Sequence, residues 1–134
     1  MTWDEWRGSL DGRPVFWTKH LLCAFGCHVD LHKMVSPDDA GCFHTHPAYA
    51  VRIILWGGYV EHLHGESALR HRALWRFWRP GMIGVVEPSM GHRIDELLND
   101  RVSYSLWIRL RKVAEVKLLG DGWPEDLRAR EFPH

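Results

Sequence analysis

The chain has 134 residues, of which 46% are hydrophobic and 25% are charged, the size and balance of one globular domain. Its 17 basic residues offset 17 acidic ones, so no long-range positive field attracts a polyanion, and a nucleic-acid partner is not expected. No secretory signal or membrane-spanning run is visible, and the 3 cysteines, an odd number, fit reduced thiols, so we expect a cytoplasmic protein without a membrane partner.

The first residues predict a short N-terminal helix. Thr2-Trp3-Asp4-Glu5 has the form of a capping box, in which the hydroxyl of Thr2 and the carboxylate of Glu5 each bond a free backbone amide at a helix start. Asp11-Gly12-Arg13-Pro14 then interrupts the chain, because these residue types favour turns.

From Val15 onward the pattern is that of an all-β domain. Short runs rich in β-branched and aromatic residues are separated by Gly, Pro, Asp or Asn. The predicted strands cover 15–22, 27–35, 48–56, 59–64, 74–79, 82–87, 92–97 and 103–110, and a last one covers 114–118. These strands follow one another without room for crossover helices, which predicts a sandwich or a jelly-roll barrel.

Two segments carry further structural information. Gly57-Gly58 can adopt the positive φ angles of a tight hairpin, so the strands on either side of it should pair directly. Residues 103–110 alternate between apolar and other side chains, which predicts a strand with one buried face. After Trp123-Pro124 the chain becomes polar, which predicts a short surface helix or a loose C-terminal tail.

Two histidines one residue apart give the strongest local signal for chemistry. In the segment Cys42-Phe43-His44-Thr45-His46-Pro47, two imidazoles project from the same face of an extended strand and can reach one ion. The best third ligand is His92, which follows the turn Pro88-Ser89-Met90-Gly91. It can meet the first pair only if the strands are neighbours in a barrel.

These histidines lie in segments that resemble the first motif of the cupin family, G-x5-H-x-H-x3,4-E-x6-G. His44 and His46 match its two histidines, and Gly57 or Gly58 matches its closing glycine. The family's metal-binding glutamate would fall at Ala50 or Val51, and neither side chain can bind a metal.

The second half of the chain resembles the second cupin motif, G-x5-P-x-G-x2-H-x3-N. Gly81, introduced by Pro80, opens the motif, Pro88 falls close to its proline, and His92 matches its histidine. The resemblance covers residues 29–110. It implies a single-domain cupin jelly-roll β-barrel that occupies the whole chain, 1–134, with a barrel core at about 15–119.

A narrower resemblance is to small single-domain cupin-like proteins of bacteria and phages. These are built around a His-x-His-Pro segment, a Gly-Gly-Tyr hairpin and a later His-Arg, here His44-Thr45-His46-Pro47, Gly57-Gly58-Tyr59 and His92-Arg93. That group brings no activity with it, so it supports the fold more than the function.

The cupin resemblance implies a metal centre at His44, His46 and His92. Three imidazoles with open coordination positions suit iron, zinc, nickel or copper better than magnesium or calcium, so we expect one divalent transition metal. Thiol dioxygenases are similar in being three-histidine cupins without the glutamate. Thiol dioxygenases also hold the carboxylate of their substrate with an arginine. In this chain the counterpart could be Arg52, Arg76 or Arg93, and no motif chooses among them.

Four further residues are candidates for the cavity around this centre: His32, Arg52, Glu61 and Arg93. His32 shares a strand face with His28 and Asp30, which is either a cavity face with an orienting carboxylate or a solvated face. Glu61 is either an ordinary surface carboxylate or a replacement for the missing glutamate.

Other histidines, cysteines and basic residues have simpler interpretations. His62 and His64 are expected to be exposed near the hairpin, and the cysteines are expected to be packed thiols. The basic and aromatic run at 70–79 is read as a strand edge or an oligomer contact, and a homodimer is expected because barrels of this family commonly associate.

Two classes of function fit these observations. The first is a metal-dependent enzyme, an oxygenase acting on a small organic substrate, which needs an inward-facing charge such as Arg52 or Arg93 to anchor that substrate. The second is a non-catalytic module that binds a metal or a small ligand. A metal-independent isomerase or epimerase is a third possibility, with Asp30 near His32 as the visible carboxylate partner of a histidine base.

Overall fold

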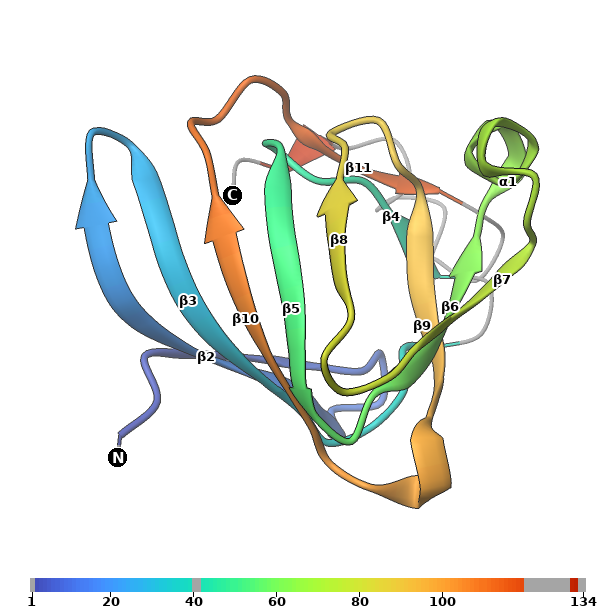
Figure 1. The fold of residues 1–134 in the computed structure, drawn as a ribbon, viewed down its shortest axis with the longest axis horizontal. Coiled ribbons are helices and arrows are strands. Elements are labelled where there is room, and N and C mark those ends of the chain that lie inside the picture. The colour runs from blue at the N-terminus through green and yellow to red at the C-terminus, as the bar shows by residue number, and fades with distance from the viewer. Residues whose placement is uncertain (1, 40–41, 120–130, 133–134) are drawn as a thin grey trace.

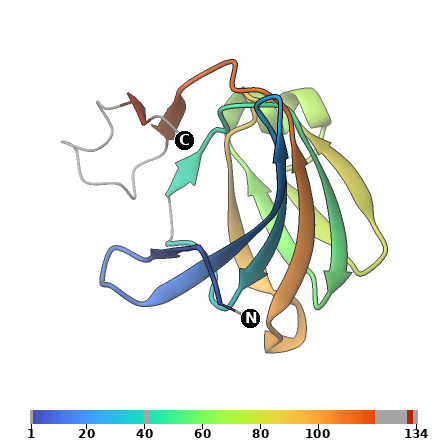
Figure 2. The same ribbon diagram turned by 90° about the vertical axis from the view of Figure 1, so that its left-hand side faces the viewer.

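Two antiparallel sheets packed face to face make up the molecule (Figures 1 and 2). The computed structural model describes residues 2–39, 42–119 and 131–132. Sheet I contains, in spatial order, β1 (Glu5–Gly8), β2 (Pro14–Ala24), β3 (Cys27–Met34), β10 (Ser103–Arg109), β5 (Ala50–Trp56) and β8 (Ile83–Val86). Sheet II contains β12 (Glu131–Phe132), β11 (Val116–Leu119), β4 (Phe43–His44), β9 (His92–Leu97), β6 (Tyr59–Leu63) and β7 (Trp75–Trp78).

The prediction of an all-β jelly roll is confirmed, with one change to its shape. Several strands that follow one another in the chain, such as β7 and β8, lie in opposite sheets. The same is true of β5 and β6, so the predicted direct pairing across Gly57-Gly58 is wrong: β5 pairs with β10 and β8, and β6 pairs with β7 and β9. Among the described strands, however, the two sheets share no hydrogen-bonded edge. The fold is therefore a jelly-roll sandwich that is open along its sides, rather than the closed barrel that the sequence predicted.

The predicted N-terminal helix is wrong, because these residues form strand β1 instead. β1 pairs with β2 in antiparallel fashion, with Glu5 opposite Thr18, and the amide of Asp4 bonds the carbonyl of Thr18 at 2.9 Å. The carboxylate of Asp4 accepts a hydrogen bond from the amide of His20 at 2.7 Å. In a capping box, the side chains of Thr2 and Glu5 would bond these backbone amides. Pairing with β2 provides hydrogen bonds for the backbone of this segment instead.

Helical structure occurs elsewhere in the described residues. α1 (Gly65–His71) lies between β6 and β7, and the 3-10 turn η1 (Leu98–Asp100) follows β9. None of the described helices has the length and apolar character needed to span a membrane. Most of the predicted polar C-terminal tail lies outside the described residues, and Glu131–Phe132 pairs with β11 as strand β12.

The middle of the inner face of sheet I is polar. Alternation along a strand is usually taken to mean that the apolar face is buried, and here the buried face carries polar side chains. Thr18, Asp30 and Ser105, on neighbouring strands, are buried. Apolar residues of the same sheet occur on both faces: Val15 and Ile54 are buried between the sheets, whereas Ile83 and Val85 on the edge strand β8 are 65% and 57% exposed. The face of residues 28, 30 and 32 that could have been solvated is therefore the face turned toward sheet II.

Apolar packing is concentrated in two clusters between the sheets. The larger consists of Val15, Met34, Ile54, Tyr59, Trp78 and Ile94, and the smaller of Ala50, Leu63, Val86 and Met90. Trp78 reaches across from the edge strand β7 and packs on Gly84 of β8. This contact closes the sandwich on the side where the chain crosses between sheets.

We predict that Gly84→Ala destabilises the protein, because a Cβ at this position overlaps the ring of Trp78, which is only 3% exposed. Overpacking of a core costs about 1–3 kcal/mol. Urea unfolding followed by tryptophan fluorescence measures the change. Val85→Ala, at an exposed position on the same strand, is the control and should change stability by less than about 1 kcal/mol. Equal midpoints for the two variants would contradict the proposed contact.

Candidate metal centre

Three histidines from different parts of the chain meet between the sheets. His44 on β4 is the direct cross-strand partner of His92 on β9. β4 ends at His44, and the amide of His46 bonds the carbonyl of Pro88 at 3.2 Å, which holds His46 beside the pair. The ring centroids of His92 lie 4.8 Å from those of His44 and 4.6 Å from those of His46.

The three side chains present nitrogen atoms to one point. One ring nitrogen from each lies within 4.8 Å of the others, so the three histidines could bind a metal ion. The Nε2 atoms of His46 and His92 are 2.6 Å apart, a hydrogen-bond distance. Around an ion they would separate to about 3.3 Å, a small rotation for the half-buried His46.

A buried carboxylate fixes the orientation of His92. The Nδ1 atom of His92 bonds a carboxylate oxygen of Glu61, which has no exposed surface. Since Glu61 accepts the proton on Nδ1, the Nε2 atom of His92 is left with its lone pair turned toward His46. Glu61 therefore lies behind His92, neither on the surface nor in the place of the missing glutamate.

Glu61 is held in turn by Arg52 and Trp78. Both terminal nitrogens of the Arg52 guanidinium donate to Glu61, at 2.6 and 2.8 Å, and Nε1 of Trp78 donates to it at 3.1 Å. The guanidinium also lies 3.9 Å from the ring centroid of Trp78. This bidentate pair is fully buried, so each charge depends on the other.

The electrostatics of this network keep Glu61 ionised. Burial raises the pKa of Glu61, but Arg52 and His92 together hold it well below its usual value. Burial likewise opposes the charge on Arg52, and Glu61 with Tyr59 offsets that effect, so the pKa of Arg52 lies above its usual value. An ionised Glu61 is the form that accepts a proton from His92.

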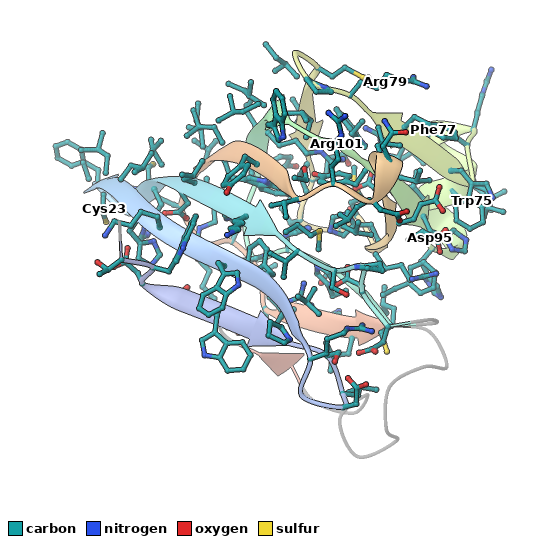
Figure 3. All side chains as sticks on the ribbon, turned by 90° about the horizontal axis from the view of Figure 1, so that it is seen from below. Cys23, Trp75, Phe77, Arg79, Asp95 and Arg101 are labelled. Atoms are coloured by element: carbon teal, nitrogen blue, oxygen red, sulfur yellow. The ribbon has the colours of Figure 1, made fainter. Side chains whose placement is uncertain are left out.

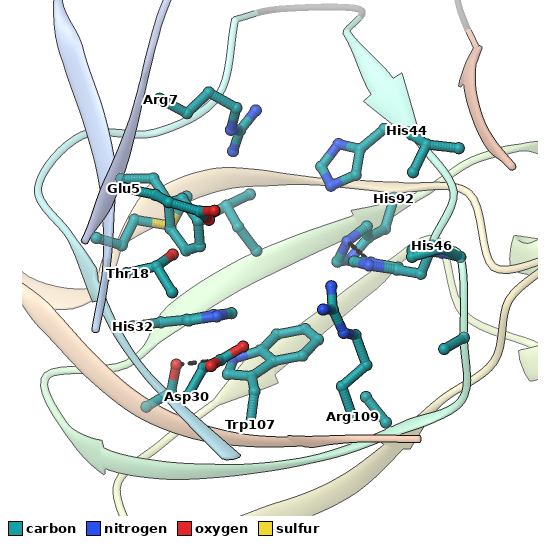
Figure 4. A pocket seen from close by; sticks show the side chains of 18 of the residues that line it. Glu5, Arg7, Thr18, Asp30, His32, His44, His46, His92, Trp107 and Arg109 are labelled. Carbon is teal, nitrogen blue, oxygen red and sulfur yellow. Dashed lines mark hydrogen bonds between the residues drawn. The ribbon is translucent and has the colours of Figure 1, made fainter. Parts of the chain in front are cut away.

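A cavity of about 620 Å³ opens beside the three histidines (Figure 4). Trp107 and His32 form part of its wall and stack with ring centroids 5.0 Å apart. Nε1 of Trp107 donates to Ser105 at 3.0 Å, which fixes the indole. Figure 4 shows the guanidinium of Arg109 pointing into the cavity toward His46 and His92.

Of the four additional cavity candidates, the structure places only His32 in the cavity lining. Arg52 and Glu61 are buried behind His92, as described above. Arg93 follows His92 on β9 and its side chain leaves the opposite face, where it bonds the carbonyl of Asp38 at 3.2 Å and the carboxylate of Asp95. The arginines that do line the cavity are Arg109 and Arg7, which the sequence analysis did not select, and the carboxylates of Glu5, Asp30 and Asp38 line it as well.

His62, His64 and Cys42 lie apart from the three-histidine cluster, and the two histidines are half-buried rather than exposed as predicted. His62 stacks on Trp75 with centroids 4.0 Å apart, and Phe43 separates it from His64, touching both rings. Cys42 is 2% exposed, and burial raises the pKa of its thiol to about 11, which suits a packed, unreactive side chain. The same prediction is wrong for Cys23, which is exposed on β2 (Figure 3).

A second polar cluster lies in the same cavity, on β2 and β3. Nδ1 of His20 bonds Asp30 at 2.7 Å, and His28 lies on the same strand face two residues before Asp30. The hydrogen bond with Asp30 raises the pKa of His20. The expected carboxylate partner of a histidine base is therefore found on His20 rather than on His32. The alternation of Phe16, Thr18 and His20 on β2 is the sequence signal that places His20 on the inner face.

Comparison with known proteins supports the fold. No protein-family model matches the chain, and no curated protein is similar to it in sequence. Among solved structures, a candidate mannose-6-phosphate isomerase from Ralstonia eutropha JMP134 superimposes with a TM-score of 0.61 at 18% identity, covering 75% of this chain and 88% of that one. Protein NMB1881 from Neisseria meningitidis matches with a TM-score of 0.52 at 19% identity, covering 69% and 81%.

A metalloenzyme is also among the similar structures. The Fe(II) form of HppE, the hydroxypropylphosphonic acid epoxidase of S. wedmorenis, matches with a TM-score of 0.58 at 11% identity. The match covers 77% of this chain and 54% of the epoxidase, so the chain spans about half of that enzyme. At these identities the likeness shows the cupin fold alone. The narrower resemblance to small cupin-like proteins of bacteria and phages stays a prediction.

We predict that Glu61→Gln lowers the free energy of unfolding by about 3–5 kcal/mol, because it leaves the charge of Arg52 buried without its partner. Chemical unfolding measures the loss. Arg76→Gln is the matched control, since Arg76 lies 3.7 Å from Glu61 and is partly exposed. Its loss should be below about 1 kcal/mol. If both variants lose the same free energy, the bidentate pair does not have the role assigned to it.

Proposed function

We propose that this chain is a mononuclear metal-dependent enzyme, an oxygenase-type cupin, that acts on a small anionic organic molecule. Its metal would be one divalent transition ion held by His44, His46 and His92. The observation that carries the proposal is the convergence of three imidazole nitrogens at a cavity wall, with one of the three rings oriented from behind by a buried carboxylate.

The donor set fits a catalytic metal better than a purely structural one. Structural zinc sites close with four protein ligands, whereas catalytic sites keep positions open for water or substrate. Only these three potential ligands meet at this point among the described residues. When bound, an ion here supplies Lewis-acid or redox chemistry to a ligand in the cavity.

The remaining cavity residues support a small anionic ligand. A volume of about 620 Å³ is in the range of sites for small molecules. Arg109 supplies a planar, permanently charged donor group that matches a carboxylate or a phosphonate. The stacked rings of His32 and Trp107 offer an apolar wall beside it. These residues would bind and orient the ligand next to the metal.

Of the similar structures, one supports this proposal and another supports an alternative, and neither identifies this chain's substrate. HppE has been solved with Fe(II) and with Co(II), which accords with a transition metal in this fold. The candidate isomerase from Ralstonia eutropha keeps open the alternatives, a metal-independent isomerase or a non-catalytic module that binds a metal or a small ligand. Two measurements distinguish these possibilities: the metal that the protein contains, and whether the metal-loaded protein consumes oxygen.

We predict that untagged protein contains about one equivalent of a transition metal at this centre, and that a His44→Ala, His46→Ala double variant loses it. Two of three neutral nitrogen donors are then missing, which leaves too few ligands for tight binding. Inductively coupled plasma mass spectrometry measures the metal. Bound iron that consumes oxygen would support the oxygenase, whereas inert zinc would support the binding module.

A His62→Ala, His64→Ala double variant is the matched control, because it removes two histidines that lie outside the cluster. It should retain the metal of the wild type. Protein that carries no metal after loading, or a control that loses as much metal as the test variant, would refute the proposed centre.

We predict that Arg109→Gln weakens binding of oxalate and of inorganic phosphate to the cobalt-loaded protein by about 10- to 100-fold, because a charge-assisted hydrogen bond is lost. Changes in the visible absorption of cobalt on titration measure the affinity. Arg111→Gln is the control, since Arg111 bonds the carbonyl of Phe25 at an exposed position outside the cavity. Anion binding that is equally strong in both variants would show that Arg109 does not contribute to ligand binding.

The expected homodimer also remains a prediction. Its direct test is the molar mass in solution, measured by light scattering on a sizing column with the metal-loaded and metal-free protein. A mass of two chains would support the homodimer, and a mass of one chain at micromolar concentration would contradict it.

A further inference from the structure

A second group of metal-binding residue types occurs on the inner face of sheet I, away from the three-histidine centre. It consists of His20 on β2 with His28 and Asp30 on β3. These two strands form a hairpin, and His20 is the direct cross-strand partner of Asp30. The register shifts between His20 and Leu22, which places Cys23 rather than Leu22 opposite His28.

The three side chains converge well enough to share an ion. One ligand atom from each lies within 4.8 Å of the others. Ligand atoms in a tetrahedral zinc site are about 3.3–3.6 Å apart, so the set needs only small side-chain rotations. The half-exposed ring of His20, with 38% of its side chain accessible, has room for such a rotation.

The chemistry of the set favours a transition metal. Two imidazoles and one carboxylate form a common donor set for zinc and for iron, while magnesium and calcium prefer oxygen donors. Asp30 has only 6% of its side chain exposed, so its charge needs a compensating cation. Glu5 on β1, with a carboxylate oxygen 3.5 Å from Nε2 of His20, adds a further negative group at the same place.

From this geometry we infer that His20, His28 and Asp30 form a second binding site for a divalent transition ion, lining the same cavity as the three-histidine centre. The inference does not require that centre to be loaded. Because His20 and Glu5 are partly exposed, the second site should exchange its ion with solvent more readily than the first. It would give the cavity a second positive charge for an anionic ligand.

A metal-free explanation of the same contacts also exists. A protonated His20 between Asp30 and Glu5 would satisfy both carboxylates by itself, at 2.7 and 3.5 Å. That explanation gives His28 no part in the cluster. A requirement for His28 therefore distinguishes an ion from a simple histidine–carboxylate pair.

The test is isothermal titration of Zn²⁺ into metal-stripped, untagged protein. We expect about two equivalents in the wild type and one in the His44→Ala, His46→Ala variant. Adding His28→Ala to that variant should weaken the remaining binding by about tenfold or more. Adding His71→Ala instead, at a histidine on α1 that lies outside both clusters, should leave it unchanged.

The outcomes separate the two sites. Retained binding after His44→Ala and His46→Ala that disappears with His28→Ala supports the second site, even if the first centre proves empty. One equivalent in the wild type that is lost entirely in the double variant supports the first centre and overturns this inference. Binding that His28→Ala and His71→Ala reduce equally also overturns it. Far-ultraviolet circular dichroism of each variant checks that the sheets are intact, and Asp30→Asn provides a second variant with the same expected loss.

Discussion

The buried contact between Arg52 and Glu61 is the interaction on which the candidate site depends. Two opposite charges without exposed surface are stable only as a pair with good hydrogen-bond geometry. Their bidentate contact joins β5 in one sheet to β6 in the other. Through Glu61 the same contact reaches His92, so the packing of the sandwich and the orientation of one imidazole are fixed together.

This network also shows how a carboxylate can orient one histidine of the cluster without being a potential metal ligand itself. The cupin motif puts a glutamate among the metal ligands, and this chain has Ala50 and Val51 in that place. Glu61 comes instead from β6, the strand that follows the Gly57-Gly58 turn, and bonds Nδ1 of His92. A carboxylate in this position sets the tautomer and basicity of the imidazole, and it leaves a coordination position open for another ligand.

The polar interior of sheet I gives the cavity its chemical character. Strands β2, β3 and β10 turn histidine, aspartate, serine, tryptophan and arginine toward the cavity, while Val15 of β2 and Met34 of β3 pack in the larger apolar cluster. Two apolar clusters at the ends of the sandwich supply the hydrophobic packing that the polar face does not. A fold that keeps its apolar packing away from the middle of the sheets has room there for a ligand cavity.

The sequence by itself determined the all-β class, most of the strands, the turn at Gly57-Gly58 and, through its resemblance to the cupin motifs, the juxtaposition of His44, His46 and His92. These features depend on local turn chemistry and on spacing within two short motifs, which a single chain displays directly. Only the tertiary structure decided which face of each strand is buried, because alternation marks two faces without saying which one lines a cavity. The same limit hid the roles of Arg109, Glu61 and His20. Glu61 bonds Arg52 of the opposite sheet, and Arg109 points across the cavity toward His46 and His92 (Figure 4). His20 bonds Asp30 of the adjacent strand, a contact that the register of the two strands decides.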